Sequence, residues 1–139
     1  MSSIIPAGDI SASALSAERQ RLNIIAQNIA NVNTTKGPDG KPYRRREVVF
    51  EEMVNAATPS QGAGVKVAEI TQSKREPIKV YMPDHPQADK DGMVSFPNIN
   101  IVEEMADMMT ASRSYEANLQ SLRVGRQMFT DSLDMGMGK

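Results

Sequence analysis

The chain has 139 residues, of which 40% are hydrophobic but only 4% aromatic, with ten Met and no Trp. Its length fits one domain, and its formal net charge of −1 gives no overall field that would indicate a nucleic acid or membrane partner. Without Cys it forms no disulfide and no Cys-ligated zinc site, and no apolar run is long enough to span a membrane.

The N-terminal segment, residues 1–35, predicts a helix over residues 9–32. Asp9 or Ser11 is expected to cap its start, and the polar residues after Ala30 with Gly37-Pro38 to end it. The start of the chain lacks the basic and apolar regions of a cleaved signal peptide, so the chain is expected either to be cytoplasmic or to leave by a route that reads no cleaved signal. Apolar residues recur at heptad-like spacing and are predicted to pack against other helices: Leu15, Leu22, Ile25 and Ile29.

The middle segment, residues 36–97, contains most of the prolines and five of the nine glycines. Short runs with alternating or β-branched residues predict strands near residues 48–50, 65–67, 78–82 and 94–96, arranged in hairpins. The basic run Arg44, Arg45 and Arg46 is followed directly by acidic residues. A salt-bridge patch between subunits or a protected strand edge therefore fits better than nucleic-acid binding, which stays open as an alternative.

The chemistry of an enzyme is mostly missing. The chain has one His and no Cys, and neither a nucleophile elbow nor a Gly-rich phosphate loop occurs. Asp84, His85, Asp89 and Asp91 lie close together, but the pattern lacks the first carboxylate and the bidentate Glu of a calcium loop. A polar turn is the preferred interpretation, and we expect no catalytic site, no metal and no cofactor.

The C-terminal segment, residues 98–139, predicts a helix over residues 100–135. Asn100 is expected to cap it, with Glu103 reaching back to the cap, and a Gly after Met135 to end it. A 4-3 repeat runs over 33 residues, roughly 50 Å of helix, which is longer than this chain buries alone. Two polar residues, Ser112 and Arg126, interrupt it, and its predicted packing residues are Ile101, Met105, Met108, Tyr115, Leu119, Leu122, Phe129 and Leu133.

The predicted fold class is therefore mainly α with a β insertion, in which the terminal helices form an antiparallel pair and keep seams for neighbouring subunits. Residues 36–82 carry a net charge of +3 and residues 83–139 a net charge of −4. The two parts are either able to attract each other between copies or are two ordinary solvated surfaces. Arg44, Arg45, Arg46 and Arg126 are the candidate polar contacts between subunits.

Specific motifs add to this interpretation. LSAERQRLNIIAQNIAN (residues 15–31) resembles the N-terminal signature of bacterial flagellar rod and hook proteins, and NINIVEEM (98–105) with SRSYEAN (112–118) resembles their C-terminal signature. In the middle, PYRRREVVF (42–50), GVKV (64–67) and YMPDHPQAD (81–89) resemble a proximal-rod member of this family. The resemblance covers nearly the whole chain.

The resemblance implies a structural subunit whose terminal helices build the coiled-coil inner layer of a tube, with the β part outside. It implies export in an unfolded state through the flagellar type III apparatus, without a cleaved signal peptide. Its implied place is the periplasmic rod of the basal body, where it contacts its own copies and neighbouring rod proteins, transmits torque and encloses the export channel. The free chain is then expected to be largely disordered in its helices. The alternatives are another axial protein, or a soluble coiled-coil adaptor or nucleic-acid-binding module that uses Arg44–Arg46.

Overall fold

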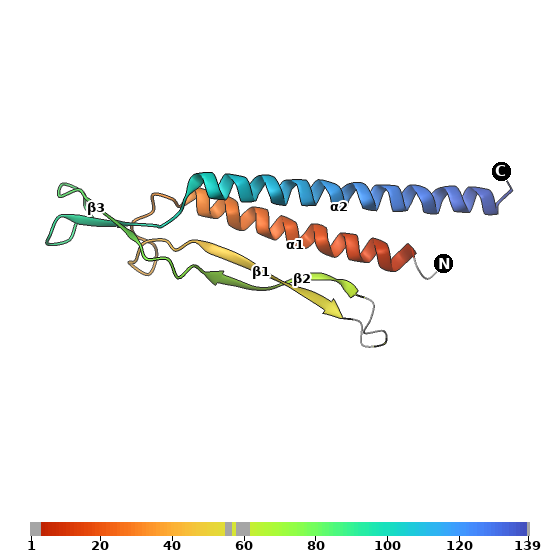
Figure 1. Cartoon of the computed structure of the whole chain (residues 1–139), viewed down its shortest axis with the longest axis horizontal. Coiled ribbons are helices and arrows are strands. Elements are labelled where there is room, and N and C mark those ends of the chain that lie inside the picture. Colours follow the sequence, from red (N-terminus) through yellow and green to blue (C-terminus); the bar gives the residue numbers. More distant parts are fainter. Residues whose placement is uncertain (1–3, 55–56, 58–61, 139) are drawn as a thin grey trace.

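The computed structural model describes residues 4–54, 57 and 62–138, and confirms a mainly α fold with a β insertion. Two long helices, α1 (Ile4–Ala30) and α2 (Ile101–Gly136), lie antiparallel, and both ends of the chain lie at the same end of the molecule (Figure 1). Between them come four strands: β1 (Arg46–Val54), β2 (Gly62–Gln72), β3 (Ile78–Tyr81) and β4 (Met93–Phe96).

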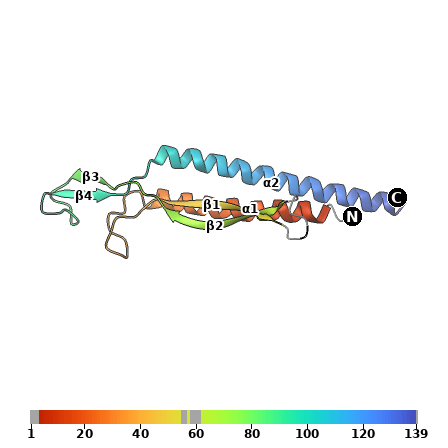
Figure 2. The ribbon, with the colours of Figure 1, turned by 60° about the horizontal axis from the view of Figure 1, so that its bottom comes forward.

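The strands form two separate antiparallel hairpins. The longer one, β1–β2, packs along α1 on the side away from α2, so that α1 lies between α2 and the hairpin (Figure 1). The shorter one, β3–β4, projects beyond the helices at the end opposite the termini, as Figure 2 also shows. All four predicted strands are present, and β1 and β2 extend beyond the predicted runs on both sides.

Helix α1 begins at Ile4, and the predicted caps Asp9 and Ser11 lie inside it, so the predicted start was wrong. The physical reason is Pro6, which a helix tolerates in its first turn because the N–H that it lacks has no helical partner there. The end of the helix is as predicted. The Asn31 side chain donates to the Gln27 carbonyl (2.8 Å) and accepts from the Thr34 hydroxyl (3.0 Å).

Helix α2 starts as predicted, since Asn100 Oδ1 accepts from the backbone N–H of Val102 (3.0 Å) and of Glu103 (3.4 Å). The predicted return bond from Glu103 to the cap is not made, because both oxygens of Glu103 bind the Arg75 guanidinium at 3.0 Å. At the other end, Gly138 adopts φ +70°, the left-handed conformation expected of a glycine that follows a helix.

The β1–β2 hairpin is placed by a close approach to α1. Gly64 has φ +125°, and a Cβ built on it would lie 3.2 Å from the Cβ of Ser13. The hydroxyl of Ser13 accepts from the N–H of Val65 (3.1 Å) and donates to the Ile10 carbonyl (2.7 Å). Only glycine combines this backbone conformation with this contact, so Gly64 fixes where the hairpin meets α1.

The core is thin for a chain of this length. Two large polar side chains, Asn28 and Glu104, are buried as completely as any apolar one, at 1% and 0% exposure. The buried apolar residues of the described part come mainly from α1 and from the segment around β4: Ala17, Ile24, Ile25, Val94, Ile99 and Ala111. The two helices are therefore held together by polar contacts as well as apolar ones.

Candidate functional site

One stripe of α2 lies against α1, and it overlaps the predicted seam in part. Six of its covered or half-buried positions follow a 4-3 repeat, and we call these the inner stripe: Glu104, Met108, Ala111, Tyr115, Asn118 and Leu122. Asp107, Ser112 and Leu119 are half-buried beside it. Its ends are fixed by Asn28, which hydrogen-bonds Glu104, and by Gly8, whose built Cβ would lie 3.9 Å from Leu122. The inner stripe shares Met108, Tyr115 and Leu122 with the predicted seam.

The other predicted packing residues of α2 are less covered. Leu119 is half-buried, while Ile101, Met105, Phe129 and Leu133 are 40–52% exposed. On α1 the predicted residues all lie at least partly covered, with Ile25 buried and Leu15, Leu22 and Ile29 half-buried. The seam of α2 is thus divided between contacts within the chain and surface that is open in one copy.

Helix α2 continues beyond the start of α1. Because Gly8 lies opposite Leu122 and the helices are antiparallel, Ile4 comes level with about residue 126. Residues 127–136, which we call the overhang, therefore extend past the described part of α1 (Figure 1). Phe129 continues the spacing of Tyr115 and Leu122 into the overhang, so the stripe does not end where its partner ends.

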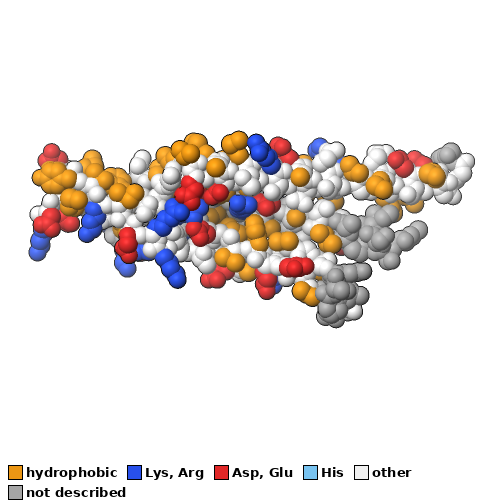
Figure 3. Space-filling model, viewed as in Figure 1, with side chains coloured by type: hydrophobic (Ala, Val, Ile, Leu, Met, Phe, Trp, Pro, Cys, Tyr) orange, Lys and Arg blue, Asp and Glu red, His pale blue; other side chains and the backbone are white. Residues whose placement is uncertain are grey.

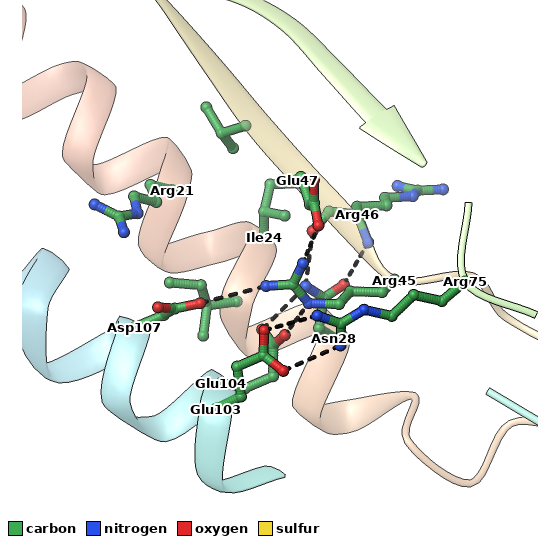
Figure 4. Close-up of a pocket in the computed structure, with 12 residues that line it drawn as sticks. Arg21, Ile24, Asn28, Arg45, Arg46, Glu47, Arg75, Glu103, Glu104 and Asp107 are labelled. Carbon is green, nitrogen blue, oxygen red and sulfur yellow. Dashed lines mark hydrogen bonds and ion pairs between the residues drawn. The ribbon is translucent and has the colours of Figure 1, made fainter. Parts of the chain in front are cut away.

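At the other end of the inner stripe lies a partly buried polar cluster, which we call the junction cluster: Asn28, Tyr43, Arg45, Glu104 and Asp107. Figure 4 shows Asn28, Arg45, Glu104 and Asp107 of this cluster. The Arg45 guanidinium, only 10% exposed, forms ion pairs with Glu104 through Nε, with Glu47 through Nη1 and with Asp107 through Nη2 (3.3 Å). These residues come from the segment before β1, from β1 and from α2, so one side chain connects the root of the hairpin to α2.

Asn28 completes the cluster from α1. Its Oδ1 accepts from the backbone N–H of Arg46 and from the Tyr43 hydroxyl, both at 2.9 Å. Its Nδ2 donates to the Arg46 carbonyl (2.9 Å) and to Glu104 Oε2 (3.2 Å). Since the amide has both its donor and its acceptor groups occupied, its burial carries no unpaired polar atom.

The surroundings of Arg45 and Tyr43 in the junction cluster raise the pKa of both side chains. Burial alone lowers the pKa of Arg45, but the hydrogen bond and charge of Glu104, with the charges of Glu47 and Glu103, raise it overall. Burial raises the pKa of Tyr43, with Arg46 acting against and Glu104 adding to the effect. Arg45 therefore stays charged and Tyr43 stays a neutral donor across the physiological pH range.

The three arginines predicted as a patch point to three different places. Arg45 lies inside the junction cluster, Arg44 donates weakly to the Ser73 carbonyl (3.4 Å), and the Arg46 guanidinium stacks on Tyr43, 5.9 Å from the ring centre. Arg126 is exposed at the root of the overhang. The sequence reasoning missed Glu104 and Asp107 as partners of Arg45, because 59 and 62 residues separate them along the chain.

The loop between β3 and β4 is a polar turn, as interpreted from the sequence. Asp89 Oδ1 accepts from the N–H of Asp91 and of Met93 (2.9 Å each), and the His85 ring lies edge-on to Phe96 at 6.2 Å. Within the described residues, no three His, Asp or Glu side chains gather as a metal site. Neither described helix is long and apolar enough to cross a membrane.

Two family models match the ends of the chain. One, described as flagella basal body rod protein, matches residues 9–38, and one, described as flagellar basal body rod FlgEFG protein C-terminal, matches residues 90–135. These ranges contain most of α1 with its exit, and β4 with nearly all of α2. The matches thus fall on the helical pair and on the segment that leads into it.

Whole-chain relatives decide the family. The flagellar basal-body rod protein FlgC of Escherichia coli O6:H1 is 46% identical, over 92% of this chain and 94% of its own length. The proteins of the same name from Borreliella burgdorferi and Agrobacterium fabrum are 40% and 37% identical, over at least 94% of each chain. This chain belongs to the FlgC family of flagellar basal-body rod proteins. It is therefore a structural subunit of the flagellar basal body, where it assembles with other rod proteins.

For a structural subunit of the FlgC family, the geometry of the junction cluster indicates a structural role. The junction cluster is occupied by its own ion pairs, and its function in a structural subunit is to hold the hairpin and the helices in one arrangement. The alternative of a nucleic-acid-binding module on Arg44–Arg46 is not favoured, because Arg45 is turned inward and is held by three carboxylates.

Proposed function

We propose that this chain is a subunit of the proximal rod that assembles through its two terminal helices and uses the open part of the α2 seam as the contact to neighbouring subunits. The observation that carries the proposal is the overhang, where α2 continues the spacing of its inner stripe without a partner from the described part of α1. Phe129 and Leu133, four residues apart on one face of this helix, are 40% and 44% exposed.

The apolar surface that supports this role is larger than the overhang alone. Figure 3 shows hydrophobic side chains along α2 and over the β3–β4 end of the molecule. Burying such surface contributes about 25 cal/mol per Å². The exposed large apolar residues of α2 are Ile101, Val102, Met105, Met109, Val124, Met128, Phe129, Leu133 and Met135. A subunit that is always surrounded by others covers these residues in the assembly.

The segments then have separate tasks in the proposal. Residues 1–35 and 98–139 form the helical layer that encloses the export channel, and residues 36–97 form the outer β part. The junction cluster supports this division, because Arg45 and Asn28 connect the hairpin to the helical pair through charged and fully bonded groups. A hairpin held in this way moves with the helices, as the transmission of torque requires.

The proposal includes the route and place of assembly. The chain passes the flagellar type III export apparatus in an unfolded state, carries no cleaved signal peptide, and assembles in the periplasm; it has no catalytic activity. The contacts of α1 with α2 and with the hairpin are made within one chain, whereas the overhang lies beyond the described part of α1. The resemblance implied that both helices are largely disordered in the free chain. Because these contacts lie within one chain, we instead expect the disorder to be mainly in the overhang, which orders on assembly, and the rest of the free chain to be folded.

Peptide mass spectrometry of detergent-extracted, acid-washed hook–basal bodies from the source organism tests the proposal. We expect this chain beside the ring and hook proteins. The double variant Phe129→Asp/Leu133→Asp should abolish its incorporation and swimming, because it places charges at the proposed contact. Arg123→Asp, on the same helix and already exposed and polar, is the matched control and should leave incorporation intact.

Two outcomes count against the proposal. If the chain is absent from basal bodies that contain other rod proteins, its place in the rod is wrong. If the double variant is incorporated as well as the control, then the overhang is not the contact. A salt-dependent shift of labelled DNA or RNA at low micromolar protein would instead support the nucleic-acid alternative.

A further inference from the structure

The two ends of the molecule carry opposite charges and matching apolar surfaces. One end is the overhang of α2, and the other holds the β3–β4 hairpin and the loop between α1 and β1 (Figures 1 and 2). The proposed function already uses the overhang, but it names no contact for the β3–β4 hairpin or for the loop between α1 and β1. The chemistry of these two elements indicates what the overhang meets.

The loop between α1 and β1 forms a basic hollow of about 360 Å³, lined by Lys41, Arg44 and Arg46 with Tyr43 and the single carboxylate of Asp39. Asp39 is occupied by the N–H of Lys41 (3.1 Å). None of the three cations forms an ion pair with another described residue, since Arg44 contacts only a carbonyl and Arg46 only an aromatic ring. The hollow therefore has unneutralised positive charge.

Beside it, the β3–β4 hairpin exposes apolar side chains. Ile78, Val80 and Met82 alternate along the strand and its continuation, so they share one direction, and all three are exposed, as is Tyr81. Val80 is paired with Val94, and paired residues project to the same face, so the exposed apolar side chains border a part of that face where Val94 is already fully buried within the chain. The end opposite the termini thus combines a basic hollow with an apolar strand.

The overhang has the complementary pair of surfaces. From Gln127 to Gly138 the sequence contains Asp131 and Asp134 and no Lys or Arg, and the next cation, Lys139, lies outside the described residues. Phe129 and Leu133 lie four residues apart on one face, whereas Asp131 and Asp134 lie three apart on another. Each aspartate is exposed and neither forms an ion pair with a described residue. One helix end therefore offers both an apolar and an acidic face.

We propose that the overhang of one copy docks at the opposite end of a second copy, with Asp131 and Asp134 at the basic hollow and with Phe129 and Leu133 against β3. This deepens the proposed function, on which it rests, by naming the partner and the surfaces of an axial contact. The contact is head to tail, because the two surfaces differ and lie at opposite ends of one chain. In a stack of subunits joined in this way, one end has a free overhang and the other end has a free hollow. The stack can therefore add further subunits, unless the rotation between subunits closes it into a ring.

Cysteine cross-linking tests the contact on a clean background, because the chain has no Cys. In the variant Lys41→Cys/Asp134→Cys, mild oxidation should give a ladder of disulfide-linked multimers, both in isolated hook–basal bodies and in the concentrated purified chain. The matched control Lys66→Cys/Asp134→Cys moves the first cysteine to an exposed lysine of β2, away from the hollow. It should give no ladder beyond the dimers that each single cysteine variant gives.

Charge reversal separates docking from folding. Arg44→Glu/Arg46→Glu and Asp131→Lys, each introduced beside Lys41→Cys/Asp134→Cys, should each reduce the ladder at least about tenfold, because like charges then face each other. Mixing the two variants, each with both cysteines, should restore the ladder. The reversed hollow of one variant then attracts the reversed overhang of the other, and their unchanged surfaces also attract each other. A merely unfolded variant would not be restored.

Each contrary result leads to a separate conclusion. If the reversals leave the ladder unchanged, or if mixing fails to restore it, the charges do not guide the contact and the proposal is overturned. If the cross-links join this chain only to a different rod protein, then the occupant is not a second copy. Incorporation into basal bodies without any ladder would overturn the end-to-end contact and leave the proposed function standing, whereas absence from basal bodies would overturn that function.

Discussion

Replacing Glu104 by Gln should weaken the fold more than any other single loss of charge on α2. Glu104 is completely buried and binds both Arg45 and Asn28. Removing one partner of a buried ion pair costs about 3–5 kcal/mol when the other is left alone. Arg45 keeps Glu47 and Asp107, whose side chains are 47% and 38% exposed and so compensate only in part. We therefore expect a loss of about 2–3 kcal/mol, since a hydrogen bond to a charged group contributes roughly that much.

The measurement is urea unfolding of the purified chain, followed by circular dichroism in the far ultraviolet. The slope of the unfolding free energy against urea concentration is fitted separately for each variant. Glu116→Gln is the matched control, because Glu116 is exposed on the same helix, and it should change the free energy of unfolding by less than about 0.5 kcal/mol. If Glu104→Gln behaved like this control, then the ion pair with Arg45 would not hold the hairpin to the helices. The double variant Arg45→Gln/Glu104→Gln should cost less than the sum of the single changes, because the two residues act on each other.

Three further predictions test other parts of the structure. Gly64→Ala should cost about 1–3 kcal/mol in unfolding free energy, because φ is +125° and the new Cβ meets Ser13, whereas Gly125→Ala, in open space on α2, should stabilise by about 0.5–1 kcal/mol; equal effects in urea unfolding would contradict the placement of the hairpin. Asn100→Ala should cost about 1 kcal/mol through loss of the cap, with Asn100→Ser largely neutral, as thermal unfolding can show. Burial raises the pKa of Glu18 above its usual 4.5, with Arg21 opposing, so the folded chain binds this proton more tightly than the unfolded chain does. The resulting penalty is absent below pH 4.5, grows as the pH rises through the raised pKa, and is complete above it; Glu18→Gln should therefore raise the urea midpoint at pH 7 but not at pH 4, and an equal rise at both would refute the assignment.

The local signals in the sequence were enough for the elements themselves. Asn100 and Gly138 delimit α2 because caps act on the nearest backbone groups, which lie within a few residues of them. The strands followed from short alternating runs between Gly and Pro. The predicted start of α1 was wrong because Pro6 and Gly8 are residue types that often interrupt a helix, whereas the first turn of a helix tolerates proline.

It was harder to predict from the sequence which residues of α2 face α1. An apolar repeat can be read from the sequence, but the inner stripe includes Glu104, Ala111 and Asn118, which are polar or small and add nothing to an apolar pattern. Ala111 is fully buried and lets the helices approach, and Glu104 is buried only because Arg45 and Asn28 meet it there. These partners are brought together by the fold over long sequence separations, so a scan for local periodicity does not find them.

The antiparallel arrangement has a consequence for the time order in which the structure forms. The contacts of α1 with α2 join residues near 8 to residues near 122, and the Arg45–Glu104 ion pair spans 59 positions. Contacts of such high sequence separation close slowly, because a long loop must be ordered before any stabilisation is gained. A chain delivered with its N-terminus first, whether from a ribosome or from a narrow pore, has no partner for one side of α1 until its last third has emerged. Completion of the helical pair is therefore the final event in the delivery of each chain.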